Sequence, residues 1–185
     1  MNTAAKLNPE APDAVRLSRV TAVDIHRSVW GFVHGQRSHK DGRNFLFDFR
    51  VSPDQILIST RDVDQPSPLR FGATYRFAIR LTPIRRRATG NGKVKERAVP
   101  RSEAQDWAIN LLARNGLRVD QVRQTLWESF LLGKKVSHKY RPHVLHTLLM
   151  SIDATVIDQE LADRAWGRGI GRGRAWGCGT LILKS

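Results

Sequence analysis

The segment Tyr75-Arg-Phe-Ala-Ile-Arg-Leu81 decides the fold class, because a large apolar side chain stands at every second position along it. Successive side chains of a β-strand point to opposite faces of the sheet, so this alternation predicts a strand with one buried face. Residues 44–50 and 55–60 are also rich in strand-forming apolar residues, and Pro53-Asp54 between them predicts a short hairpin turn. The first half of the chain is therefore predicted to contain a β-sheet.

A helix is predicted on the N-terminal side of these strands. Thr21-x-x-Asp24 fits a capping box, and apolar residues then recur at helical spacing until Gly35 ends the run. Residues 2–8 have a weak strand pattern, and residues 61–70, which hold two prolines, predict a short irregular helix or a loop. The first half then has an order close to βαββαβ, the ferredoxin-like order that RNA-recognition domains share.

The second half is predicted to have a similar architecture. Ser102 is expected to cap a helix that Asn115-Gly116 ends. Further along the chain, the pattern predicts strands in 117–133 and 144–152, a helix at 153–166 and a closing strand at 177–183.

These two halves define the expected domain organisation. We expect an α+β protein with two tandem ferredoxin-like, RRM-like βαββαβ domains. The N-terminal domain is placed at residues 1–83, a basic linker or hairpin at 84–101, and the C-terminal domain at 102–185.

The chain carries a large positive charge. Its 185 residues include 31 Lys and Arg against 17 Asp and Glu, a formal net charge of +14 with histidine neutral. A surplus of this size indicates a polyanionic partner, most often nucleic acid. No apolar run is long enough to span a bilayer, and the N-terminus lacks the layout of a secretory signal. Cys178 is the only cysteine, which excludes an intrachain disulfide, and a cytosolic (cytoplasmic) protein is expected.

Three runs carry much of the positive surplus. Residues 84–101 hold a single acid, Glu96, and a central turn signal, so a loop or hairpin with basic arms is predicted. The other two runs lie at 134–141 and 164–174. A run of charge is often only a solvated face, but three runs of one sign favour contacts to phosphates. A membrane surface ranks lower, because these runs are rich in glycine or turns and do not form a basic amphipathic helix.

The glycine-rich segment Arg168–Leu183 allows two interpretations. Glycines let backbone N–H groups approach a phosphate closely, and the interleaved arginines supply charge. Alternatively, the glycines only permit a tight connection from a helix to the last strand. The segment is not a Walker loop, because no Gly-Lys-[Ser/Thr] follows its glycines. A dinucleotide fingerprint is also excluded, because Gly169, Gly171 and Gly173 follow a predicted helix and precede the last strand.

His26 lies on the first predicted helix. Taken alone, a helical histidine is usually a structural or surface residue. Next to bound RNA, a histidine with a pKa near neutrality can take the proton of a 2′-hydroxyl or give one to the leaving 5′-oxygen. No His-x-x-x-His or Glu-x-x-His pair suggests a metal site, so no metal and no cofactor are expected.

The C-terminal segment Gly169-Ile-Gly-Arg-Gly-Arg-Ala-Trp-Gly-Cys-Gly-Thr-Leu181 resembles the glycine-rich ending of the CRISPR-associated endoribonucleases of the CasE family. Other parts of the chain resemble this family in the same order. They include Asp24-Ile-His26-Arg27, Asn44-Phe-Leu-Phe47, the strand and basic loop from Tyr75 to Lys93, and Ser102-Glu-Ala-Gln-Asp-Trp107.

The resemblance implies a function for the chain. Members of this family cleave precursor CRISPR RNA without a metal, within each repeat at the 3′ base of its stem-loop. The cut leaves a 2′,3′-cyclic phosphate and a 5′-hydroxyl, and the product stays bound in a type I-E Cascade complex with other subunits, including its backbone protein. The alternatives are a non-catalytic RNA-binding subunit of a CRISPR ribonucleoprotein and, with less support, a DNA-binding protein.

The resemblance also implies roles for single residues. His26 is the expected acid/base residue, and Arg27 is expected to stabilise charge on the phosphate. Some relatives have a tyrosine three residues before the histidine, but Val23 stands there in this chain, so the second proton-transfer group is open. The expected RNA contacts are Arg85, Arg86, Arg87, Lys93, Lys95, Arg97, Lys134, Lys139, Arg168, Gly169, Gly171, Arg172, Gly173 and Arg174.

Overall fold

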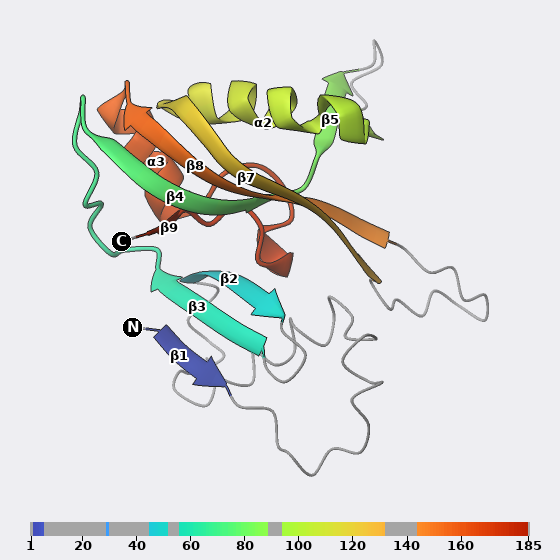
Figure 1. Ribbon diagram of the computed structural model, residues 1–185, viewed down its shortest axis with the longest axis horizontal. Helices are drawn as coiled ribbons and strands as arrows, with labels where there is room; N and C mark the ends of the chain where they lie inside the picture. Colours follow the sequence, from blue (N-terminus) through green and yellow to red (C-terminus); the bar gives the residue numbers. More distant parts are fainter. Residues whose placement is uncertain are drawn as a thin grey trace.

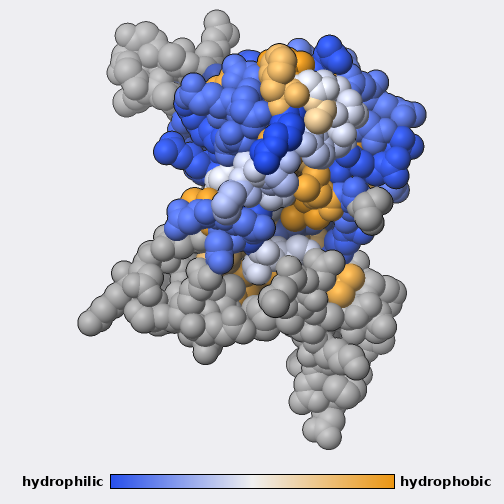
Figure 2. Space-filling model, turned by 90° about the vertical axis from the view of Figure 1, so that its left-hand side faces the viewer, coloured by the Kyte–Doolittle hydropathy of each residue, from blue (hydrophilic) through white to orange (hydrophobic). Residues whose placement is uncertain are grey.

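The computed structural model describes residues 2–5, 29, 45–51, 56–88, 94–131 and 144–184. These residues form an α+β structure whose sheets are antiparallel (Figure 1). Hydrophilic side chains dominate the face seen in Figure 2, as expected for a chain with 26% charged residues. Among the described residues, no helix is long and apolar enough to cross a membrane.

The larger sheet has the spatial order β7-β8-β4-β9. In chain order its elements are β4 (Thr74–Leu81), α2 (Ala104–Ala113), β7 (Leu117–Leu131), β8 (Val144–Val156), α3 (Gln159–Arg168) and β9 (Ile182–Leu183), that is, βαββαβ. Buried apolar side chains of both helices belong to one core with those of the strands, so both helices cover the same face. The other face is turned toward the smaller sheet (Figure 1).

The second half of strand β4, from Phe77 to Leu81, is buried on both faces. Phe77, Ile79 and Leu81 are fully buried in the core shared with the helices, as their spacing predicts. Complete burial of side chains of this size stabilises the fold by about 1.5–3 kcal/mol each. On the opposite face, Ala78 and Arg80 are 3% and 1% exposed. The prediction of a single buried face is therefore wrong for this half of the strand, because the smaller sheet covers its second face.

The smaller sheet has the order β1-β3-β2, from β1 (Asn2–Ala5), β2 (Phe45–Val51) and β3 (Ile56–Asp62). Phe45, Phe47 and Phe49 alternate along β2 and form a second core with Ile58 of β3. The C-terminal segment lies between the two sheets (Figure 1), where the Thr180 hydroxyl donates to the Phe47 carbonyl over 2.8 Å. The strands predicted near residues 2–8, 44–50 and 55–60 are confirmed.

The strand at 74–81 is also confirmed, but its partners differ from the sequence-based expectation. That expectation grouped it with the strands of residues 1–83. In the structure β4 pairs with β8 and β9, from Thr74↔Thr155 to Leu81↔Leu148 along β8. Alternation within a strand determines which face is buried, but it carries no information about the neighbouring strand.

The buried guanidinium of Arg80 joins the two sheets. It donates to the Phe49 carbonyl over 2.8 Å, lies over the Phe49 ring at 4.4 Å, and forms ion pairs with Asp48 and Glu128. Burial raises the pKa of Asp48 above its ordinary value, against the opposing effect of Arg80. The network connects β2 of the smaller sheet with β4 and β7 of the larger one.

A second arginine, Arg61 of β3, connects the smaller sheet to the C-terminal segment. Its guanidinium donates to the carbonyls of Leu181 and Trp166 and lies 3.6 Å from the centre of the Trp166 indole ring. Burial lowers the pKa of Arg61 to about 10. Trp166 lies two residues before the glycine-rich segment, so Arg61 holds the chain that leads into that segment against the smaller sheet.

Two helix starts differ from prediction. β8 continues to Val156, and α3 starts only at Gln159, where the Asp158 carboxylate caps the helix by accepting from the Leu161 N–H over 2.9 Å. Ser102 lies within the 3-10 turn η3 (Arg101–Glu103), and α2 has no side-chain cap. The closing strand predicted at 177–183 is also shorter, since residues 177–181 are irregular and only Ile182–Leu183 form β9. The helix predicted after Thr21 lies outside the described residues, except Val29, which is helical and buried.

Candidate nucleic-acid interface

The predicted basic hairpin is confirmed as two paired strands, β5 (Ile84–Ala88) and β6 (Val94–Ala98). Its base is closed by a hydrogen bond from the Val99 N–H to the Pro83 carbonyl over 2.8 Å. Four of the predicted contact residues, Arg85, Arg86, Lys95 and Arg97, are exposed on it. Arg87 is on β5, and Lys93 lies outside the described residues.

Part of the glycine-rich segment is explained by packing. Gly177 has φ +74°, and a Cβ atom there would lie 2.8 Å from the rings of Phe47 and Phe49. At Gly179, with φ +83°, a Cβ atom would lie 2.2 Å from the Ile170 carbonyl oxygen. Side chains at these two positions are therefore excluded, and the glycines allow a tight connection. The structural interpretation of the segment is correct for its C-terminal part.

At the tip of the segment, Gly171 to Gly173, packing crowds only Gly173, where a Cβ atom would lie 2.4 Å from the Thr82 hydroxyl oxygen. No described residue accepts a hydrogen bond from the N–H groups of Gly171, Arg172 or Gly173. Gly171 and Gly173 have φ +75° and +77°, and they flank the exposed Arg172. Successive free N–H groups at alternating left-handed residues form anion-binding concavities. The phosphate interpretation stays a prediction, which the geometry of these three residues allows.

Two clefts meet at this tip and share Gly171 and Arg172. One, of about 570 Å³, is lined by Thr82, Ile84, Arg85, Arg86, Trp107, Leu111, Arg114, Gly171 and Arg172. The other, of about 560 Å³, is lined by Phe45, Leu46, Val63, Arg168, Gly171, Arg172, Gly173, Arg174, Ala175 and Trp176. The fold thus brings two of the three basic runs together, although they are about 80 residues apart in sequence.

The carboxylate of Glu96 connects these two runs. It accepts from Arg86 Nε at 3.2 Å within the hairpin and forms an ion pair with Arg172 of the glycine-rich tip. All three side chains are about half exposed, so each pair contributes no more than about 1 kcal/mol to stability. A phosphate approaching the tip would compete with Glu96 for the same two guanidinium groups.

The remaining predicted residues divide into two groups. Arg168 and Arg174 line the second cleft, and the Arg174 guanidinium donates to the Arg168 carbonyl over 2.8 Å. Gly169 precedes the tip and donates its N–H to the Ala165 carbonyl at the end of α3. Outside the described residues lie His26, Arg27, Lys93, Lys134 and Lys139.

Sequence reasoning missed some lining residues. Arg114, at the end of α2, lines the first cleft, but a lone arginine after a helix carries no distinguishing signal. Cys178 is fully buried, and burial raises the pKa of its thiol to about 11, so it is a neutral packing residue at physiological pH. In the described part of the chain, no three His, Cys, Asp or Glu side chains are grouped as metal ligands.

Comparison with known structures gives similar folds. A CRISPR endoribonuclease, Cse3, bound to a 19-nucleotide RNA has a TM-score of 0.70 at 22% identity, with all of both chains covered. Thermus thermophilus Cse3 bound to an RNA representing a pre-cleavage complex has a TM-score of 0.65 at 22% identity, over 100% of this chain and 98% of that one. A chain of a CRISPR RNA-guided surveillance complex has a TM-score of 0.58 at 18% identity, over 98% and 97%.

At the level of sequence, no curated protein is significantly similar to this chain. The model of one protein family, described as CRISPR associated protein, matches residues 55–185. This range includes β3, β4, the basic hairpin and the whole glycine-rich segment. The match confirms the family resemblance found in the sequence, and the chain belongs to this family of CRISPR-associated proteins.

Proposed function

We propose that this chain is a metal-independent endoribonuclease that cleaves precursor CRISPR RNA at the 3′ base of each repeat stem-loop and retains the product as a subunit of a Cascade-type complex. The observation that carries the proposal is the meeting of the basic hairpin with the free N–H groups of Gly171–Gly173. Membership of a CRISPR-associated family and a fold similar to RNA-bound Cse3 support it.

The fold behind this proposal is a tandem of two ferredoxin-like units. The order β4-α2-β7-β8-α3-β9, with the spatial order β7-β8-β4-β9, has the connectivity of one such unit. The smaller sheet, ordered β1-β3-β2, has the arrangement of the first three strands of another. On this basis we propose that the second unit starts at β4, with the basic hairpin inserted after it, rather than at residue 102.

The RNA stem would be held by its backbone. An A-form helix is recognised by shape and phosphates, because side chains cannot read its narrow major groove. The hairpin arms carry exposed cations, and Lys95 and Arg97 form no ion pair with any described residue. If about six phosphates are contacted, affinity should fall about 10³-fold between about 50 and 200 mM salt, by analogy with duplex DNA.

The cleavage step would use the RNA's own nucleophile. His26 takes the proton of the 2′-hydroxyl, whose oxygen forms a bond to the adjacent phosphorus, or protonates the 5′-oxygen as the P–O5′ bond breaks. The products are a 2′,3′-cyclic phosphate and a 5′-hydroxyl. Arg27 would stabilise the negative charge that grows on the phosphate.

Cleavage of a hairpin RNA in EDTA tests this function. We expect a single cut by the purified protein, and no cut when the scissile nucleotide carries a 2′-deoxyribose. A product from the 2′-deoxy substrate at the normal rate would exclude the 2′-hydroxyl mechanism. Tight hairpin binding without product over several hours would instead indicate a non-catalytic RNA-binding subunit. This alternative has a basis in the sequence, because Val23 stands where some relatives have a tyrosine.

The ion pairs of Glu96 predict a gain of RNA affinity in Glu96→Gln. The amide no longer competes with phosphates for Arg86 and Arg172, so hairpin affinity should rise by up to about fivefold. Fluorescence anisotropy at fixed salt measures the change. The control Glu160→Gln removes the same charge from α3, where Glu160 pairs with Arg164. Equal affinities of the two variants, or weaker binding by Glu96→Gln, would contradict the competition.

A further inference from the structure

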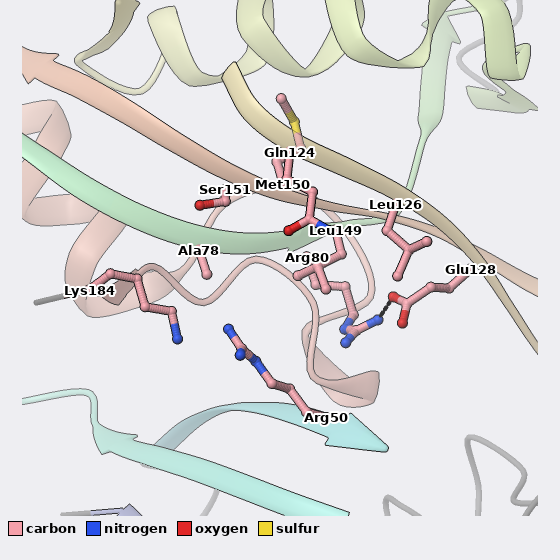
Figure 3. Close-up of a pocket in the computed structure, with 10 residues that line it drawn as sticks. All are labelled: Arg50, Ala78, Arg80, Gln124, Leu126, Glu128, Leu149, Met150, Ser151 and Lys184. Carbon is pink, nitrogen blue, oxygen red and sulfur yellow. Dashed lines mark hydrogen bonds and ion pairs between the residues drawn. The ribbon is translucent and has the colours of Figure 1, made fainter. Parts of the chain in front are cut away.

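A third cleft lies between the two sheets, on the face of the larger sheet opposite the helices (Figure 3). Its volume is about 400 Å³, and it is lined by Arg50, Ala78, Arg80, Gln124, Leu126, Glu128, Leu149, Met150, Ser151 and Lys184. The lining comes from β2, β4, β7, β8 and the residue after β9. It shares no residue with the two clefts at the glycine-rich tip.

Two cations that form no ion pair with any described residue, Arg50 and Lys184, face each other across this cleft. In Figure 3, Arg50 points from β2 toward the ammonium group of Lys184. Burial and the charge of Arg50 lower the pKa of Lys184, whereas Asp48 has the opposite effect. No described carboxylate forms an ion pair with either side chain, because the nearby acids Asp48 and Glu128 both contact Arg80. An anion between Arg50 and Lys184 would relieve their mutual repulsion.

The rest of the lining favours a nucleotide as the source of that anion. Among the described residues, the side chains of Gln124 and Ser151 have no hydrogen-bond partner, so both are available to polar groups of a ligand. Leu126 is 48% exposed and offers an apolar surface to a base. The volume fits a small ligand and is far too small for a duplex.

We propose that this cleft binds one nucleotide of a single-stranded RNA segment that flanks the hairpin, with its phosphodiester between Arg50 and Lys184. The proposal rests on the proposed function, since it concerns the same RNA. No aromatic side chain lines the cleft, so the base is held by apolar contact rather than by stacking. Such a contact tolerates different bases and would hold the flank independently of its sequence.

The test compares three RNA probes by anisotropy: the hairpin alone, the hairpin with a 5′ extension, and the hairpin with a 3′ extension. We expect one extension to strengthen binding by the wild type and the double variant Arg50→Ala/Lys184→Ala to lose this gain. Each single-strand phosphate contact adds about 0.7 to the salt slope, so one contact makes the gain fall about 2.6-fold between about 50 and 200 mM salt. The control Arg70→Ala/Arg118→Ala removes two exposed arginines outside the basic runs and should keep the gain.

Two outcomes would overturn the inference: neither extension changes wild-type affinity, or the double variant keeps the full gain. Failure of the proposed function is distinct, because it is seen with the hairpin alone, either as no binding or as binding without cleavage in EDTA. A 4-thiouridine in the extension should crosslink to peptides containing Leu126 or Lys184 in the wild type, which tests the site without any variant. A poly-glutamate peptide could also be used as a competitor. If it displaced the extension from the cleft as well as unlabelled RNA does, the cleft would be assigned to an acidic protein segment and the RNA proposal would be overturned.

Discussion

His26→Ala is expected to abolish cleavage of the repeat hairpin while leaving its binding nearly unchanged. A positioned acid/base group contributes about 10²–10⁴-fold to a rate, so the single-turnover rate constant should fall by that factor. Binding is expected to persist, because the proposed contacts are cations of the hairpin and N–H groups of the glycine-rich tip. The measurement pairs single-turnover cleavage in EDTA with anisotropy on a 2′-deoxy substrate.

Two further measurements separate a chemical role of His26 from a structural one. Added imidazole should restore part of the cleavage by His26→Ala, since it can supply the missing proton transfer. His146→Ala is the matched control: His146 is exposed on β8, and its Nδ1 atom lies 2.9 Å from the Ser129 hydroxyl. Cleavage by His26→Ala at the wild-type rate would make the catalytic assignment wrong.

Arg80→Ala is expected to lower the free energy of unfolding by about 3–5 kcal/mol, because it leaves the buried carboxylate of Asp48 without its counter-charge. Asp48 is 5% exposed and would keep no ion pair with a described residue, and the Phe49 carbonyl would lose its 2.8 Å hydrogen bond. Urea unfolding followed by circular dichroism measures the loss.

Arg76→Ala provides the control on the same strand. Arg76 pairs with Asp153, which keeps its second partner Arg123, and its side chain is 45% exposed. The expected loss is below about 1 kcal/mol, as for other exposed ion pairs. If both variants lost the same free energy, the buried network between the sheets would not stabilise the protein as described.

Local features of the fold could be predicted from the sequence, and long-range ones could not. The alternation in 75–81 and the turn signal within 84–101 are short-range patterns, and the strand and the hairpin are both present. The pairing of β4 with β8 joins residues more than 65 positions apart, which no local pattern encodes. The late start of α3 could not be predicted either. An apolar residue such as Val156 fits a helix as well as a buried strand, and only the cap Asp158 marks the boundary.

The candidate site was predictable to a similar degree. The two basic runs were visible as charge, and the structure brings them together through Glu96 and Arg172. From the sequence, Gly171 could not be separated from Gly173, Gly177 and Gly179, because the difference depends on whether another element fills the space of a side chain. Arg80 was missed because its position in the alternation predicts exposure, and the smaller sheet that buries it comes from an earlier part of the chain.

The basic hairpin follows β4 of the larger sheet and precedes α2. A hydrogen bond from the Val99 N–H to the Pro83 carbonyl joins the two ends of the hairpin. Its two strands hydrogen-bond to each other and not to the strands of that sheet. The length and sequence of the hairpin therefore do not affect how the strands of the larger sheet pair. A change in the hairpin would leave the strand pairing of the core intact, and under the proposed function this is where the fit to a different RNA would be adjusted.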